Sequence, residues 1–142
     1  MNKYEKRLFN EWLQHDKIVI GVDFDSTISH WHTIDNHKDI ERCISVLKKA
    51  QQTGCYITIH TACDKSRYQD ILNHCASIGI EVNSINENPI ELPYGQNSKI
   101  YANIFLDDRA GLNEALDTLE TAMYAYIGEI QSDIIASQQN HE

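Results

Sequence analysis

The chain has 142 residues, a formal net charge of −9, and a composition that is 42% hydrophobic and 23% charged. This length suits one domain with a buried core, and the composition excludes wholesale disorder. The acidic balance argues against nonspecific binding to polyanions, which depends on clustered Lys and Arg. No run approaches the ~18 apolar residues of a membrane span, and the charged N-terminus lacks the apolar centre of a secretory signal. We therefore expect a cytoplasmic protein without a membrane partner.

Helical and strand patterns alternate along the chain. Apolar residues at helical spacing predict helices over 1–14, 37–53, 65–78 and from Gly111 to about residue 136. Runs rich in β-branched residues predict strands over 18–23, 55–61, 80–83 and 102–106. Both prolines fall within residues 86–98, so we expect a loop there.

Strands that alternate with helices in this way predict an α/β fold with a mainly parallel sheet, joined by right-handed crossovers. The expected architecture is a Rossmann-like three-layer sandwich. We expect a single domain in which residues 1–16 form an N-terminal helix or arm, 17–136 the core, and 137–142 a frayed tail.

The chain contains four cysteines, none of them in a CxxC pair: Cys43, Cys55, Cys63 and Cys75. Three of the four fall within predicted helices or strands. We interpret them as reduced thiols in or near the core, which agrees with a cytoplasmic location.

Asp23 and Asp25 follow an apolar strand and stand one residue apart. In open α/β sheets, ligands bind in the crevice beyond the carboxyl ends of the strands. Two carboxylates at such a position suit a hard divalent cation, and one of them is able to attack a substrate covalently. This strand end is the first candidate for the functional site.

Two later strands also end on polar residues, the second on Thr61 and the fourth on Asp107 and Asp108. Parallel strands bring such ends to one edge of the sheet, and Lys99 lies just upstream of the fourth strand. The predicted site therefore combines four carboxylates, one hydroxyl and one ammonium group. This set is what phosphoryl transfer through an aspartyl phosphate requires.

Two groups of histidines lie close to these positions. His60 directly precedes Thr61, so strand alternation predicts that its side chain points to the opposite face and packs there. His30 and His32 lack a third ligand at suitable spacing, and we interpret their segment as a loop beside the mouth of the site.

In these motifs the chain resembles the haloacid dehalogenase (HAD) superfamily of phosphohydrolases. The four motifs of that family correspond to the DxDxT segment 23–27, Thr61, Lys99 and the pair Asp107-Asp108, in the family's order. The segment 99–110, which includes Arg109, resembles a small branch of phages and bacteria that lacks a cap domain. The ending of paired acids and Arg is also similar to the phosphatase domain of polynucleotide kinase-phosphatases.

The resemblance and the chemistry together suggest a role for each residue. Asp23 is the expected nucleophile, Asp25 the general acid and base, and Thr61 and Lys99 hold the transferring phosphoryl group. The expected cofactor is Mg²⁺, bound by Asp23, Asp25 through its backbone carbonyl, Asp107 and Asp108. The candidate substrate-binding residues are Ser26, Thr27, Ala62, Arg67 and Arg109.

The sequence departs from the family pattern at two places. Ser26 stands where the family commonly has Gly, a small residue for a small one in a tight turn. Related small members often have an Arg soon after the second motif, whereas here Ala62 follows Thr61, and Lys65 or Arg67 would have to replace that Arg. The second departure concerns the substrate more than the chemistry.

Core helices and strands occupy most of the chain between the motifs, which leaves no room for a large cap. The site is therefore open, or it is covered by residues 28–37, by residues 86–98 or by a partner subunit.

The expected function is an Mg²⁺-dependent phosphomonoester hydrolase. The net charge favours a small phosphorylated metabolite or nucleotide over a polynucleotide 3′-phosphate. The alternatives are a polynucleotide 3′-phosphatase and a non-hydrolytic phosphoacceptor or binding module.

Overall fold

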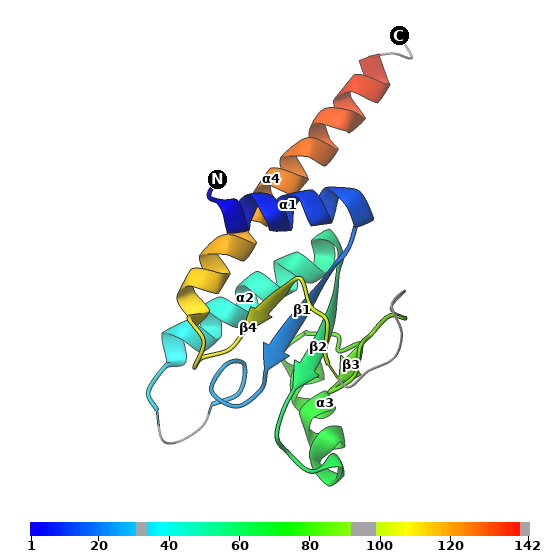
Figure 1. Ribbon diagram of the computed structural model, residues 1–142. Coiled ribbons are helices and arrows are strands. Elements are labelled where there is room, and N and C mark those ends of the chain that lie inside the picture. Colours follow the sequence, from blue (N-terminus) through cyan, green and yellow to red (C-terminus); the bar gives the residue numbers. More distant parts are fainter. Residues whose placement is uncertain (31–33, 92–98, 140–142) are drawn as a thin grey trace.

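The structure, a computed structural model, describes residues 1–30, 34–91 and 99–139 (Figure 1). Its helices are α1 (Lys3–His15), α2 (His37–Gly54), the short 3₁₀ helix η1 (Lys65–Arg67), α3 (Tyr68–Ser77) and α4 (Leu112–Gln139). Its strands are β1 (Ile18–Asp23), β2 (Cys55–His60), β3 (Ser84–Ile85) and β4 (Ile104–Leu106). In the described residues the strands form one all-parallel sheet in the order β3-β2-β1-β4. The predicted α/β class is confirmed, because helices flank this parallel sheet as in a Rossmann-like sandwich.

β1 occupies the centre of the sheet, between β2 and β4. Its residues Ile18, Ile20 and Val22 are completely buried, as expected for a parallel strand that is covered on its faces. The register pairs Val22 with Leu106 on one side and Asp23 with His60 on the other. The carboxyl end of β1 therefore lies between the ends of its two neighbours.

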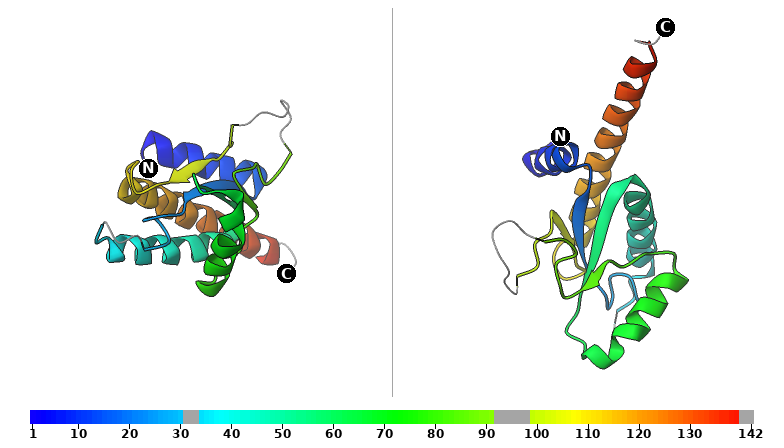
Figure 2. Two further views of the ribbon diagram at one scale, coloured as in Figure 1. Left: turned by 90° about the horizontal axis from the view of Figure 1, so that it is seen from below. Right: turned by 90° about the vertical axis from the view of Figure 1, so that its right-hand side faces the viewer.

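The helices lie on both sides of the sheet. Seen along its edge, α2 and α3 lie on one side, and α1 and the segment before β4 lie on the other (Figure 2). The Trp12 ring of α1 stacks on the Tyr126 ring of α4, with ring centroids 5.3 Å apart. This contact fixes α1 against α4 near the amino ends of the strands, opposite the edge that carries the acids.

Two asparagines extend the pairing of the sheet beyond the two short strands. The backbone N–H of Asn103 donates to the Val19 carbonyl at 2.8 Å, and its side-chain oxygen accepts from the Val19 N–H at 2.6 Å. Asn83 makes the same two bonds to Ile57, each of 2.8 Å. Because a side-chain amide replaces a backbone group, regular pairing begins only at Ser84 and Ile104.

Several predicted boundaries are therefore corrected. The strand expected over 80–83 lies instead at Ser84–Ile85, and the strand expected over 102–106 begins at Ile104. The helix expected over 65–78 divides into η1 and α3, because the Asp64 side chain accepts a bond from the Ser66 N–H and starts a tighter turn.

The last helix is longer than predicted, because α4 continues to Gln139 and includes the start of the expected frayed tail. Residues 140–142 lie outside the described part of the chain. The final turns of α4 extend away from the body of the protein (Figure 1). None of the helices in the described residues combines the length and the apolar character needed to cross a membrane.

All four cysteines are free thiols, as the sequence predicts. Burial raises the pKa of the Cys43 and Cys55 thiols to about 12 and that of Cys75 to about 11. These three side chains are therefore protonated at neutral pH and act as small apolar groups of the core.

Candidate active site

The candidate active site lies at the carboxyl edge of the sheet, where the chain leaves β1 in a tight turn. The backbone N–H groups of Thr27, Ile28 and Ser29 lie 3.2–3.3 Å from the Phe24 carbonyl. Ser26 has φ of 65°, in the left-handed region that residues with a Cβ rarely adopt. The turn thus explains on physical grounds why Gly is suitable at this position. The Ser26 carbonyl also accepts a bond of 2.6 Å from the Asn36 side chain, which ties the turn to the start of α2.

Thr27 joins the turn after β1 to the end of β4. Its hydroxyl oxygen lies 3.1 Å from Asp23 Oδ2 and 3.2 Å from Asp108 Oδ1, and it accepts a bond of 3.0 Å from the Asp108 N–H. Thr27 is fully buried, with 0% of its surface exposed. We therefore interpret Thr27 as a positioning residue, which replaces its sequence-based assignment to substrate binding.

Asp23 lies in an environment that disfavours its charged form. The pKa of its carboxyl group is raised to about 7, chiefly by burial, then by a hydrogen bond with Asp108 and by the negative charge of Asp107. The bond from Thr27 acts in the opposite direction. The carboxyl groups of Asp23, Asp107 and Asp108 therefore lie close together, and a bound cation would offset their mutual repulsion.

His60 belongs to this cluster. One nitrogen of its ring and one carboxylate oxygen from each of Asp23 and Asp107 all lie within 4.8 Å of one another. The prediction that His60 points away from the site is wrong. β2 ends at His60, where the register pairs this residue with Asp23, so the two side chains lie on the same face of the sheet. Only the strand register reveals the position of His60, because the sequence alone does not determine which residues pair.

A glycine and an aromatic ring position the imidazole. A Cβ atom at Gly21 would lie 2.7 Å from Cδ1 of Phe105, so the absence of a side chain leaves room for this ring over β1. The Phe105 ring in turn meets the His60 ring edge to face, with centroids 6.0 Å apart. Burial lowers the pKa of His60, against the opposing effect of Asp107, and so favours the neutral imidazole that is able to bind a metal.

Thr61 directly follows β2 at the same edge, and its backbone is held in place. The Asn86 side chain accepts from the Thr61 N–H and donates to the Thr61 carbonyl, each bond being 2.8 Å long. The Thr61 hydroxyl accepts a bond from the Cys63 N–H at 3.1 Å. Among the described residues this hydroxyl has no acceptor, so its proton is available to donate to a bound anion.

The predicted cationic residues lie around the edge on exposed segments. The backbone carbonyl of Lys99 accepts a bond of 3.0 Å from Asn88, which holds it upstream of β4. Arg67 lies in η1, and its guanidinium donates to Cys63 Sγ at 3.6 Å. The backbone N–H of Arg109 donates to Asp107 Oδ1 at 2.9 Å, and in the described residues its guanidinium has no hydrogen bond or ion pair. Arg109 is thus available for an anionic ligand.

Hydrogen bonds of Thr27 connect Asp23 with Asp108. The donor atoms of Asp23, Asp107 and His60 lie close together. Asp25 is half-buried in the turn, and Ala62 is exposed after Thr61. In the described part of the chain, no hydrogen bond or ion pair joins Asp25, Ala62 or Arg67 to Asp23 or Asp107. The segments expected to cover the site contain residues 31–33 and 92–98, which are not among the described residues.

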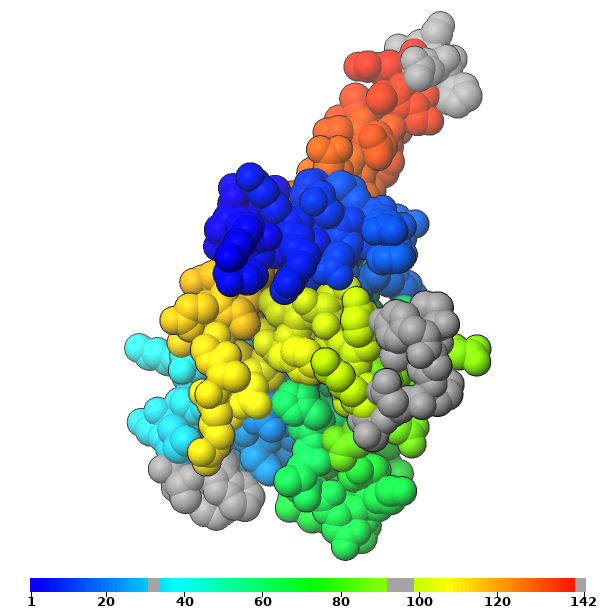
Figure 3. All heavy atoms as spheres, in the orientation of Figure 1, coloured from blue at the N-terminus to red at the C-terminus, as the bar shows by residue number. Residues whose placement is uncertain are grey.

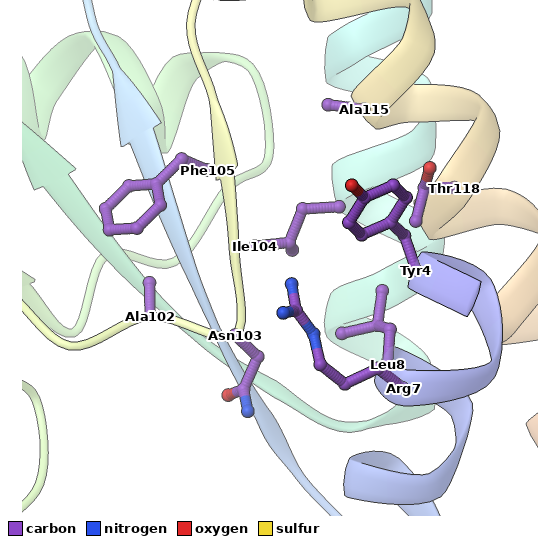
Figure 4. A pocket seen from close by; sticks show the side chains of 9 residues that line it. All are labelled: Tyr4, Arg7, Leu8, Ala102, Asn103, Ile104, Phe105, Ala115 and Thr118. Atoms are coloured by element: carbon purple, nitrogen blue, oxygen red, sulfur yellow. The ribbon is translucent and has the colours of Figure 1, made fainter.

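The three strand ends meet at the surface. In the space-filling view, the segment after β1 (blue) emerges between the segment after β4 (yellow) and the segment after β2 (green) (Figure 3). A separate cavity of about 300 Å³ lies between α1, β4 and α4, and Tyr4, Arg7, Leu8 and Ile104 are among its lining residues (Figure 4). None of the predicted catalytic residues lines this cavity, so it is separate from the candidate active site.

The fold is similar to that of a conserved protein from Bacteroides thetaiotaomicron, with a TM-score of 0.53 and 26% identical residues. The similarity covers 66% of this chain and 77% of that protein. It supports the α/β fold, and the description of that protein names no activity. No protein-family model matches the chain, and no curated protein matches it significantly.

Proposed function

We propose that this protein is a cation-dependent phosphomonoester hydrolase that acts through an aspartyl phosphate on Asp23. The observation that carries this proposal is the convergence of Asp23 and Asp107 at the carboxyl edge of the sheet, with donor oxygens within 4.8 Å of each other. The same edge holds Thr61, and Thr27 links Asp23 to Asp108. On the motif resemblance, we further propose membership of the HAD superfamily and of its small branch without a cap.

The residues at this edge fit a divalent cation such as Mg²⁺, which prefers oxygen ligands. Asp23 and Asp107 would hold it, with the Asp25 carbonyl and Asp108 as the further candidates from the sequence. The raised pKa of Asp23 supports this fit, because the crowded carboxyl groups require a positive charge to stay ionised together. When bound, the cation offsets the repulsion between the Asp23 carboxylate and the incoming phosphate.

The side chains then divide the reaction into two balanced steps. In the first, an Asp23 oxygen attacks phosphorus, the bond to the ester oxygen breaks, and Asp25 gives its proton to the departing alcohol. In the second, Asp25 takes a proton from water, the water oxygen attacks phosphorus, and inorganic phosphate leaves Asp23. The Thr61 hydroxyl and the Lys99 ammonium group stabilise the transferring oxygens throughout.

We propose a small phosphorylated metabolite or nucleotide as the substrate and the cytoplasm as the location. The net charge of −9 and the crowding of acids at the site favour a small substrate over a long polyanion. Arg109 and Arg67 are exposed beside the edge and are the candidates to bind the rest of the substrate. The free thiols agree with a reducing compartment.

The test is a screen of phosphoesters with Mg²⁺, in which nucleotides, sugar phosphates and a 3′-phosphorylated oligonucleotide are compared. The wild-type protein is expected to release phosphate, and Asp23→Asn is expected to abolish release while the fold is retained. Asp64→Asn, which changes an exposed acid outside the cluster, is the matched control. Turnover by Asp23→Asn would refute the role of Asp23. A stable phosphorylated protein without release would indicate a phosphoacceptor module instead.

A further inference from the structure

We propose that His60 is a nitrogen ligand of the cation site, so that this site binds first-row transition-metal ions more tightly than Mg²⁺. The inference rests on the proposed cation site and deepens it, because it concerns which ion is selected. Its basis is the position of one imidazole nitrogen beside Asp23 and Asp107.

The first step is the distance between the donor atoms. Donors that bind one ion at about 2.0–2.2 Å lie at most about 4.4 Å apart. The donor atoms of Asp23, His60 and Asp107 all lie within 4.8 Å of one another. Small side-chain movements therefore suffice for the three groups to bind one ion together.

The second step is the state of the imidazole. Nε2 of His60 is buried and has no hydrogen-bond partner in the described residues. Buried polar atoms are normally satisfied, and an unsatisfied one needs a physical explanation. Coordination of an ion by Nε2 would supply one, because a metal-binding histidine offers one ring nitrogen to the ion.

The third step is the packing that holds the ring. The Phe105 ring meets the imidazole at an interplanar angle of 70°, and Gly21 leaves the space that Phe105 requires. The Asp107 carboxylate is oriented by a bond of 2.9 Å from the Arg109 N–H. Two of the three donors are therefore positioned by neighbours before any ion arrives, which lowers the cost of binding.

The chemistry of the donors then decides the ion. Mg²⁺ prefers oxygen ligands, whereas imidazole favours transition metals. A set of two carboxylates and one imidazole therefore favours the binding of Co²⁺ or Mn²⁺ over that of Mg²⁺. A set of carboxylates alone would favour them less. Removal of the imidazole is expected to weaken Co²⁺ binding much more than Mg²⁺ binding.

The experiment is calorimetric titration of the metal-free protein, without substrate, with Co²⁺ and with Mg²⁺. For the wild type, we expect the Kd for Co²⁺ to be at least about tenfold below that for Mg²⁺. His60→Ala is expected to raise the Kd for Co²⁺ at least about tenfold and that for Mg²⁺ less than about threefold. His15→Ala, in the last turn of α1, is the matched control and is expected to change neither.

Pulsed EPR of bound Mn²⁺ supplies a direct readout. The wild type is expected to show modulation from a coordinated ¹⁴N nucleus, and His60→Gln, which keeps a polar side chain, is expected to lose it. An oxygen-only signal in the wild type, or an equal loss of Co²⁺ and Mg²⁺ affinity in His60→Ala, would overturn the inference. Circular dichroism tests whether both His60 variants are folded. If one of them is unfolded, the other still tests the inference.

The two proposals fail in different ways. Nitrogen coordination and a preference for Co²⁺ without any phosphate release would support the role of His60 and refute the hydrolase. Phosphate release with a purely oxygen-coordinated ion would support the hydrolase and refute the role of His60.

Discussion

The hydroxyl of Thr27 accepts a hydrogen bond of 3.0 Å from the backbone N–H of Asp108, and this bond joins the loop after β1 to the loop after β4. The same oxygen lies within hydrogen-bond distance of the carboxylates of Asp23 and Asp108. One buried side chain thus sets the distance between two segments that are 81 residues apart. The geometry of the site depends on it.

Thr27→Val is expected to lower the free energy of unfolding by about 1–3 kcal/mol, because it leaves a half-buried N–H without a partner. It also releases Asp23, so phosphate release is expected to fall further than stability alone explains. Urea unfolding and initial rates measure the two effects. Thr53→Val, whose hydroxyl bonds only to the carbonyl one turn earlier in α2, is expected to cost less than about 0.5 kcal/mol. Equal costs for both variants would contradict the linking role.

Asp23 predicts a dependence of stability on pH. Its pKa is about 7 in the folded protein against 3.8 ordinarily, so its stabilising contribution is complete below 3.8 and is lost as the pH rises through about 7. In metal-free buffer at about pH 8, Asp23→Asn is expected to be more stable than the wild type by on the order of 1–2 kcal/mol, after allowance for solvent screening. This advantage disappears in acid, where Asp23 is protonated in both states.

Thermal unfolding from acid to alkaline pH measures the difference, with Asp133→Asn on the exposed end of α4 as the control. The prediction fails if the stability difference between Asp23→Asn and the wild type is the same at every pH. Added divalent cation is expected to raise the melting temperature of the wild type and to leave that of Asp23→Asn nearly unchanged.

Gly21→Ala is expected to destabilise the protein by about 1–3 kcal/mol, because the new methyl group would meet the Phe105 ring at 2.7 Å. Phe105→Ala removes that ring. The double variant is therefore expected to lose less stability than the sum of the two single variants, and a double-mutant cycle in urea measures this coupling. Strict additivity would mean that the ring moves aside without cost.

Ser26→Gly is expected to preserve the turn after β1, with a change in stability of less than about 1 kcal/mol, because Gly adopts a positive φ without strain. Ser26→Val is expected to cost more than about 2 kcal/mol, because a β-branched residue resists this conformation and the site is buried. Chemical denaturation compares the two. A well-tolerated Val would show that the turn relaxes to another conformation.

Much of the fold could be predicted from the sequence because it depends on local patterns. The apolar run 18–22 of β1 and the helical spacing in α2 mark these elements without any reference to distant residues. For the short strands β3 and β4, the sequence predicts starts that lie before the observed ones. There the side chains of Asn83 and Asn103 take over pairing with Ile57 and Val19, and no propensity describes such a substitution.

The sequence by itself determined the α/β class and the acids at the ends of the strands, because parallel strands that alternate with helices always direct those ends to one edge. Only the tertiary structure decided which side chains meet there. The register of β1 with β2 brings His60 to Asp23, and the packing of two loops buries Thr27 between Asp23 and Asp108. Register and packing arise from contacts between segments that are distant in the sequence, so local sequence patterns do not predict them.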